Sequence, residues 1–244
     1  MADIQRGKIE EQMLYSDILG EDVTLLVYYP PNFSPLYKYT ILIAQDGRDY
    51  FTLGRIARTA DRLLDEQKIE NTIIVGIPYR DVEDRRAKYH PKGEKHRAYL
   101  RFLANELVPY LDHAFPTYQM GGGRALIGDS LAGTVSLLAA LSYPHTFGRV
   151  LLQSPYVTDD VLSAVESFEH TQLLEVYHVI GKNETAVETT NGKTKDFIRP
   201  NRKLNELFKA KGFTFFYDEF DGDHTWTYWQ PDLERALAVM LKRY

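Results

Sequence analysis

The sequence predicts an α/β fold, in which helices cover both faces of a mostly parallel, twisted sheet. Short apolar runs alternate along the chain with longer amphipathic segments, and this order is typical of parallel strands joined by helical crossovers. The chain has 244 residues, of which 44% are hydrophobic and 13% aromatic. Because that composition can fill one core in a sheet protein of this size, we expect a single domain over residues 1–244.

The elements follow from the spacing of apolar residues. The predicted strands are residues 23–29, 39–45, 72–77, 124–127, 149–153, 174–180 and 213–219. The predicted helices are residues 54–68, 95–115, 131–143, 159–167, 202–211 and 232–242. The first two strands are expected to pair antiparallel, because residues 30–38 are too few for a crossover helix. Two long polar segments, residues 79–93 and 181–196, are expected to be functional loops.

Composition excludes several classes of function. The formal net charge is −5, and a weakly acidic surface repels polyphosphate, so nucleic acid is not an expected partner. The chain has no cysteine, which excludes disulfides, thiolate nucleophiles and cysteine-ligated metals. The first twelve residues lack the apolar core of a secretory signal, and no segment is apolar enough for a membrane span. We therefore expect a cytoplasmic protein whose covalent chemistry uses an oxygen nucleophile.

The segment ALIGDSLAG places Ser130 between an apolar strand and an apolar helix. Gly128 precedes the serine by two residues, and Ala132 and Gly133 follow it. Small residues at these positions let a strand and a helix approach at a strained turn, the arrangement called a nucleophile elbow. Ala132 departs from the strict G-x-S-x-G pattern by one methyl group. The alternative interpretation is that Ser130 only caps the helix that follows.

His224 is the candidate general base. It lies in FDGDHTWTYWQ, after the last predicted strand and before the last predicted helix, and in this class of fold the triad order is serine, acid, histidine. Gly222 permits a tight turn, and Trp226 and Trp229 can shield the imidazole from water. The alternative is a surface histidine in an aromatic turn, while His178 falls within a predicted strand and is expected to pack in the core.

The motifs DGRDYF, GDSLAG and DGDHTWTYW, in this order over nearly the whole chain, resemble the putative-esterase family of α/β-hydrolases. This group includes esterase D, enterochelin esterases, feruloyl esterases and mycobacterial mycolyltransferases. The resemblance implies the α/β-hydrolase fold, a small-molecule ester as substrate, Trp226 near that substrate, and chemistry without a metal or cofactor. It is compatible with a homodimer, a common assembly for soluble proteins. It does not select the substrate.

The acid of the triad is expected in the loop after residues 174–180, which offers Glu184, Glu188 and Asp196. Glu184 comes three residues after Gly181, where family members with a short loop carry their acid. Asp196 opens DFIRPNRKL, which resembles the acid-bearing segment of relatives with a longer loop. Because the loop is long here, Asp196 is the preferred acid and Glu184 the alternative. Asp196 could instead cap a helix, and Glu184 could be an ordinary solvated carboxylate.

An oxyanion hole needs two backbone N–H groups. One is expected from Leu131, the residue after the nucleophile, and the resemblance implies that Arg48 supplies the other. Arg48 and Arg80 could also favour an anionic substrate.

These residues predict a serine hydrolase that cleaves carboxylic esters through an acyl-enzyme on Ser130. One alternative is an esterase of ferric siderophore trilactones, whose basic, aromatic rim would consist of Arg85, Arg86, Lys88 and Tyr89. The other alternative, outside the enzymes, is a catalytically silent binding protein that keeps the hydrolase fold.

Overall fold

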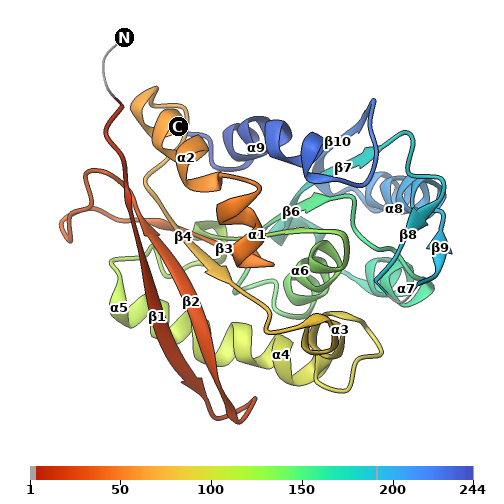
Figure 1. Ribbon diagram of the computed structural model, residues 1–244, viewed down its shortest axis with the longest axis horizontal. Helices are drawn as coiled ribbons and strands as arrows, with labels where there is room; N and C mark the ends of the chain where they lie inside the picture. The colour runs from red at the N-terminus through yellow and green to blue at the C-terminus, as the bar shows by residue number, and fades with distance from the viewer. Residues whose placement is uncertain (1–3, 191, 244) are drawn as a thin grey trace.

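One large sheet runs through the part of the chain that the structure describes, residues 4–190 and 192–243 of a computed structural model (Figure 1). Its strands lie in the order β1-β2-β4-β3-β5-β6-β7-β10. In chain order they are β1 (Lys8–Ser16), β2 (Glu21–Tyr29), β3 (Thr40–Gln45), β4 (Thr72–Ile77), β5 (Arg124–Asp129), β6 (Arg149–Gln153), β7 (Glu175–Gly181) and β10 (Thr214–Phe220). A small antiparallel hairpin, β8 (Val187–Glu188) with β9 (Thr194–Lys195), stands apart from this sheet.

Strand β2 pairs antiparallel with both β1 and β4, and all pairs from β4 to β10 are parallel. The expected antiparallel pairing of residues 23–29 with residues 39–45 is therefore wrong, because β4 lies between β2 and β3. Every residue of β3 is buried, and a continuous apolar run of that kind suits a central parallel strand. Strand β1 was not predicted. It is an edge strand with many exposed side chains, so its apolar pattern is weak.

Helices cover both faces of the sheet (Figure 1). The α-helices are α1 (Gly47–Thr52), α2 (Ile56–Asp65), α3 (Val82–Tyr89), α4 (His96–Phe102), α5 (Val108–Ala114), α6 (Ser130–Ser142), α7 (Asp159–Ser167), α8 (Ile198–Lys211) and α9 (Trp226–Met240). A π-helical turn (Leu103–Leu107) joins α4 to α5, and short 3₁₀ turns lie at Gly121–Gly123 and Thr171–Leu173. The predicted loop 79–93 contains α3, and the predicted loop 181–196 contains the β8–β9 hairpin.

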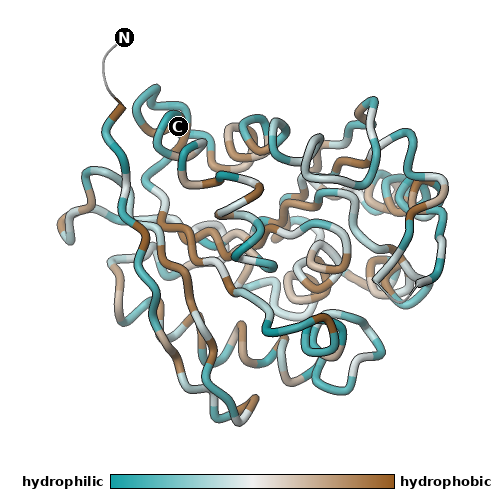
Figure 2. The backbone as a smooth tube through the Cα atoms, viewed as in Figure 1, coloured by the Kyte–Doolittle hydropathy of each residue, from teal (hydrophilic) through white to brown (hydrophobic). Residues whose placement is uncertain are grey.

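Two cores lie on the two sides of the sheet. Along β3, Ile41 and Ile43 pack with the side of α4 to α8, whereas Leu42 and Ala44 pack with the side of α1, α2 and α9. This alternation follows from the two-residue period of a strand. The central strands are accordingly the most hydrophobic segments of the backbone (Figure 2).

The parallel strands end at the same edge of the sheet, so the residues that follow them gather there. The chain leaves β3 at Asp46, β5 at Ser130, β6 at Ser154 and β7 just before Glu184, and His224 follows β10. No helix in the described ranges has both the length and the apolar character to cross a bilayer.

Candidate active site

Ser130 lies where β5 meets α6, in a left-handed backbone conformation with φ of 48°. Such a conformation is strained for a non-glycine residue and is found at functional turns. The strand and helix approach so closely that a Cβ atom on Gly128 would lie 2.3 Å from the carbonyl carbon of Ala132. Ala132 itself is fully buried, so a methyl group fits at the position where the strict motif has glycine.

His224 lies beside this serine. Its Nε2 atom is 2.9 Å from Ser130 Oγ, which donates its proton to that nitrogen in a serine–histidine pair. The loop that carries His224 is held by the loop that follows β7, because Asn183 N–H donates to the carbonyl of Gly222 at 3.0 Å. A Cβ atom on Gly222 would collide with the ring of Tyr228, 2.3 Å away, so the turn needs glycine.

Glu184 completes the chain of hydrogen bonds. Its Oε2 atom accepts from Nδ1 of His224 at 2.6 Å. Its Oε1 atom accepts from the hydroxyl of Ser154 at 2.6 Å and from the N–H of Gly181 at 2.8 Å. The glutamate is 1% exposed, and a buried carboxylate with three donors is fixed in orientation.

The preference for Asp196 as the acid is therefore corrected. Its carboxylate accepts from the backbone N–H of Arg199 at 3.2 Å and pairs with the Arg199 guanidinium at 3.4 Å. It thus lies at the start of α8, the capping role named as its alternative. The loop after β7 is long because it contains the β8–β9 hairpin. This hairpin follows Glu184, so the turn from Gly181 to Glu184 is as short as in family members without the longer loop. Glu188 lies on β8 and is exposed.

Aromatic rings enclose the imidazole. The ring centroid of His224 is 4.5 Å from that of Phe197 and 4.8 Å from that of Trp229. Trp229 Nε1–H also donates to the hydroxyl of Ser154 at 3.0 Å, so the tryptophan and Glu184 share one serine. No motif marks Ser154 in the sequence; its own left-handed φ of 49° becomes visible only in the structure.

Trp226 does not have the expected position. It packs edge-on against the ring of Tyr50 at 4.9 Å and is not among the residues that line the cavity at Ser130. Gly54 also contacts it, since a Cβ atom there would be 2.7 Å from the indole. Trp226 therefore belongs to the packing of the α1, α2 and α9 side, and Trp229 is the tryptophan of the site.

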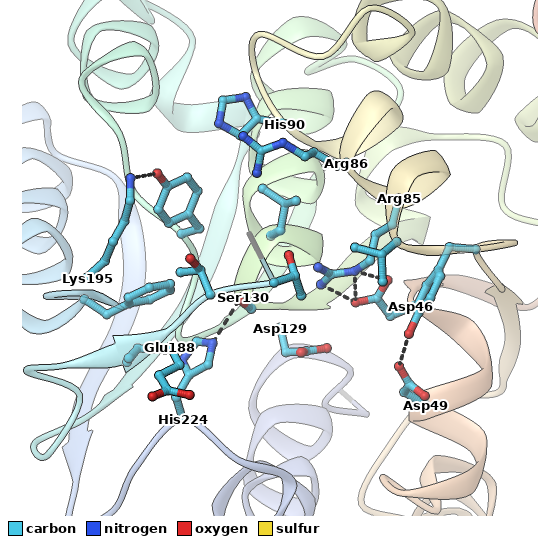
Figure 3. A pocket seen from close by; sticks show the side chains of 18 of the residues that line it. Asp46, Asp49, Arg85, Arg86, His90, Asp129, Ser130, Glu188, Lys195 and His224 are labelled. Carbon is cyan, nitrogen blue, oxygen red and sulfur yellow. Dashed lines mark hydrogen bonds and ion pairs between the residues drawn. The ribbon is translucent and has the colours of Figure 1, made fainter. Parts of the chain in front are cut away.

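A cavity of about 280 Å³ opens over Ser130 (Figure 3). Leu131 lines it, and its backbone N–H stays a candidate for the oxyanion hole. Arg48 and Arg80 instead line a neighbouring cavity, and the Arg80 guanidinium bonds to Asp81 at 3.0 Å. Neither arginine side chain therefore faces the serine, and only the backbone N–H of Arg48 stays a candidate.

Carboxylates line the end of the cavity near α1. Asp46 is held by the guanidinium of Arg85 through bonds of 2.6 to 2.9 Å. Burial and the nearby charge of Asp46 raise the pKa of Asp129 to about 8. Asp129 Oδ1 has no hydrogen-bond partner in the described part of the chain. The carboxyl group that precedes the candidate nucleophile therefore holds its proton to a higher pH than an ordinary aspartate does.

Two further observations bear on the sequence predictions. His178 is fully buried, its Nε2 lies 2.8 Å from Asn201 Oδ1, and burial lowers its pKa to about 4, all consistent with a core residue. Among the residues described, no group of three or more His, Cys, Asp or Glu side chains has the arrangement of a metal site.

The sheet order and the site at the carboxyl ends of its strands define an α/β-hydrolase fold. The chain belongs to the family described as "Putative esterase", whose model matches residues 16–240, and it is an ester hydrolase. The resemblance and the fold class predicted from the sequence are thereby confirmed.

One relative is similar to the chain in sequence, and two solved structures are similar to it in fold. The chain is 52% identical over 237 residues to "Uncharacterized protein YjcH" of Bacillus subtilis, covering 97% of this chain and 99% of that protein. A ferulic acid esterase has a similar structure, with a TM-score of 0.79, 16% identity, and coverage of 97% of this chain and 98% of the other. The enterobactin esterase of Shigella flexneri has a TM-score of 0.81 and 18% identity, and the match covers 96% of this chain and 58% of that one.

Proposed function

We propose that the protein hydrolyses carboxylic esters through an acyl-enzyme on Ser130. The observation that carries this proposal is the continuous chain of hydrogen bonds from Ser130 through His224 to Glu184. A hydroxyl becomes a nucleophile at neutral pH when an adjacent base accepts its proton, and a third group keeps that base oriented.

In the proposed reaction His224 Nε2 takes the proton from Ser130 as Oγ attacks the ester carbonyl. The tetrahedral oxyanion accepts hydrogen bonds from the backbone N–H of Leu131 and from a second donor, for which we propose Arg48. His224 then gives its proton to the leaving alcohol. A water molecule, deprotonated by His224, attacks the acyl-enzyme and releases the acid and the free serine.

Glu184 does not exchange a proton in this scheme. As a carboxylate that can only accept hydrogen bonds, it holds Nδ1 protonated, leaves Nε2 free to accept, and stabilises the imidazolium when it forms. Ser154 and Gly181 keep the carboxylate in place.

The siderophore-trilactone alternative has less support than simple ester hydrolysis. Of its expected basic, aromatic rim, Arg85 is bound to Asp46 and Lys88 pairs with Glu21 and Asp84. Tyr89 is 1% exposed. Only Arg86 is left to meet a ligand.

The test is hydrolysis of p-nitrophenyl acetate and butyrate by the wild type and by Ser130→Ala and His224→Ala. Each variant is expected to lose at least about a thousandfold in kcat. Labelling of the wild type, but not of Ser130→Ala, by a fluorophosphonate probe is the second readout. Turnover that survives in Ser130→Ala would overturn the mechanism, and an unreactive wild type that resists the probe would point to the silent binding protein.

A further inference from the structure

Three nitrogen-bearing side chains gather at the end of the cavity away from Asp46 and Asp49. Arg86 and His90 come from α3 and the residue that follows it, and Lys195 comes from β9 (Figure 3). In the same view Asp46 and Asp49 lie on the opposite side of Ser130. The cavity therefore has a basic end and an acidic end, with the serine between them.

The cations at the basic end have no carboxylate partner. Arg86 is exposed and forms no ion pair with any residue in ranges 4–190 and 192–243. The ammonium of Lys195 donates to the phenol oxygen of Tyr156 and lies 4.8 Å from the centre of its ring, without an ion pair inside the same ranges. The other cation that lines the cavity, Arg85, is neutralised by Asp46.

His90 adds a neutral donor. Its Nδ1 atom accepts from the backbone N–H of Lys92 at 3.1 Å, so the ring proton resides on Nε2. Burial, followed by the charges of Arg86 and Lys195, lowers the pKa of His90, which keeps the ring neutral near pH 7; Asp160 opposes this shift. All three residues line the same cavity, so one ligand bound there can contact them together. Glu188, on the strand paired with that of Lys195, also lines the cavity and is exposed.

The basic end is tied to the reacting groups by backbone hydrogen bonds. Tyr156, which holds Lys195, donates its N–H to the carbonyl of Ser130 at 2.9 Å. Phe197, two residues after Lys195, packs on the ring of His224 and donates its N–H to the carbonyl of Glu184 at 2.9 Å. An anion bound by Lys195 would therefore be held at a fixed offset from the serine hydroxyl.

We infer that the natural substrate is an anionic ester, whose carboxylate or similar oxyanion is bound by Arg86, His90 and Lys195 while its ester carbonyl lies at Ser130. Charged donors bind oxyanions more strongly than neutral ones do, and two unpaired cations at one end of a cavity attract such a group. This inference rests on the proposed function and adds the substrate class. It also replaces Arg48 and Arg80, which face the neighbouring cavity, as the source of positive charge.

The experiment compares esters that differ only in charge. For the acyl side, the p-nitrophenyl monoester of adipic acid is compared with the same ester whose distal carboxylate is a primary amide. For the alcohol side, 3-carboxyphenyl acetate is compared with 3-carbamoylphenyl acetate. Each kcat/KM is divided by the rate of spontaneous hydrolysis in buffer, so that the chemical reactivity of the ester cancels.

In the wild type at low salt, the anionic member of one pair is expected to be preferred about tenfold, and the pair that shows the preference identifies the side that carries the charge. The preference should shrink at high ionic strength, because Arg86 is exposed and Lys195 only half-buried, and salt screens charges that contact solvent. Lys195→Met and Arg86→Gln should each lower the ratio of anionic to neutral kcat/KM by about fivefold to tenfold. Lys195→Arg keeps the positive charge, so it should retain most of the wild-type ratio of anionic to neutral kcat/KM.

Lys209→Met is the matched control, since it removes one positive charge from an exposed position on α8. Its ratio should equal that of the wild type. A wild type that hydrolyses the neutral esters without preferring either anionic one would overturn the inference and leave the proposed function standing. A preference that persists in both Lys195→Met and Arg86→Gln would also overturn it. A wild type that cleaves none of the four esters would count against the proposed function itself.

Discussion

The carboxylate of Glu184 and the imidazole of His224 meet at 2.6 Å, between Oε2 and Nδ1, whereas the carboxylate of Asp196 is bound to Arg199. Only the first contact can hold the imidazole in the tautomer that accepts from Ser130. We therefore expect Glu184→Gln to lower kcat by at least about a hundredfold, because the amide cannot stabilise the imidazolium as a carboxylate does. Asp196→Asn should keep kcat within about threefold of the wild type.

The two variants are compared on p-nitrophenyl butyrate, and circular dichroism checks that both are folded. Each substitution replaces one carboxylate by its amide and changes the net charge equally, so either serves as the charge control for the other. A large loss in Asp196→Asn, with Glu184→Gln active, would reverse the assignment of the acid.

Ser154 helps to hold Glu184 in contact with His224. Its hydroxyl donates to Glu184 and accepts from Trp229, and it is fully buried. Ser154→Ala should lower the free energy of unfolding by about 1 to 3 kcal/mol, because the indole N–H is left without that acceptor. It should also lower kcat about tenfold with little change in KM, since the acid loses one of its positioning bonds.

The control for Ser154→Ala is Ser136→Ala. Ser136 is equally buried, and its hydroxyl donates to the carbonyl of Ala132 at 2.8 Å, within α6. Steady-state kinetics should register a loss of kcat in Ser154→Ala and not in Ser136→Ala. Equal kinetics in the two would reduce Ser154 to a packing residue.

The contrast between Ser130 and Glu184 shows how far the sequence could predict the site. Ser130 and His224 are marked by local patterns, because a strained turn needs small neighbours and the base follows the last strand. The acid is not marked locally, since three carboxylates share one loop. Which of them reaches His224 depends on where the chain forms the β8–β9 hairpin, and that hairpin brings Asp196 to the start of α8. Long-range contacts of this kind have no periodicity that a sequence displays.

The fold shows the same division. Buried central strands such as β4 were predicted to the residue, at 72–77, because most of their side chains are apolar and β-branched. Edge strand β1 and helix α3 were missed, since exposed elements carry polar residues at most positions. The strand order, with β4 between β2 and β3, depends on pairing between distant segments and could only be expected from the resemblance.

Gly128 should be the glycine at the elbow that tolerates substitution least. A Cβ atom would lie 2.3 Å from both the carbonyl carbon and the oxygen of Ala132, and neither backbone atom can move without separating α6 from β5. Gly128→Ala is expected to destabilise the fold by more than about 3 kcal/mol, as overpacking at a rigid backbone contact does. Gly122→Ala is the control, because the nearest atom to its Cβ would be 3.9 Å away. Thermal unfolding measures both, and a Gly128→Ala variant as stable as Gly122→Ala would contradict the close contact.

The buried carboxyl group of Asp129 should make stability depend on pH. Burial first, and then the charge of Asp46, raise its pKa to about 8, so the folded chain holds a proton that the unfolded chain has released above about pH 4. A group whose pKa is raised in the folded state stabilises the protein at low pH. This contribution to the free energy of unfolding is lost as the pH rises toward 8, by at most about 1.4 kcal/mol per pH unit. Asp129→Asn keeps the shape of the side chain without an ionisable group. Its free energy of unfolding, relative to that of the wild type, should therefore rise by about 2 kcal/mol as the pH increases from 6 to 8. Urea unfolding at several pH values measures this gain, with Asp65→Asn as the control for loss of an exposed carboxylate. Curves for Asp129→Asn and wild type that stay parallel across this range would mean that Asp129 is ionised in the folded protein, and that Arg85 stabilises its charge together with that of Asp46.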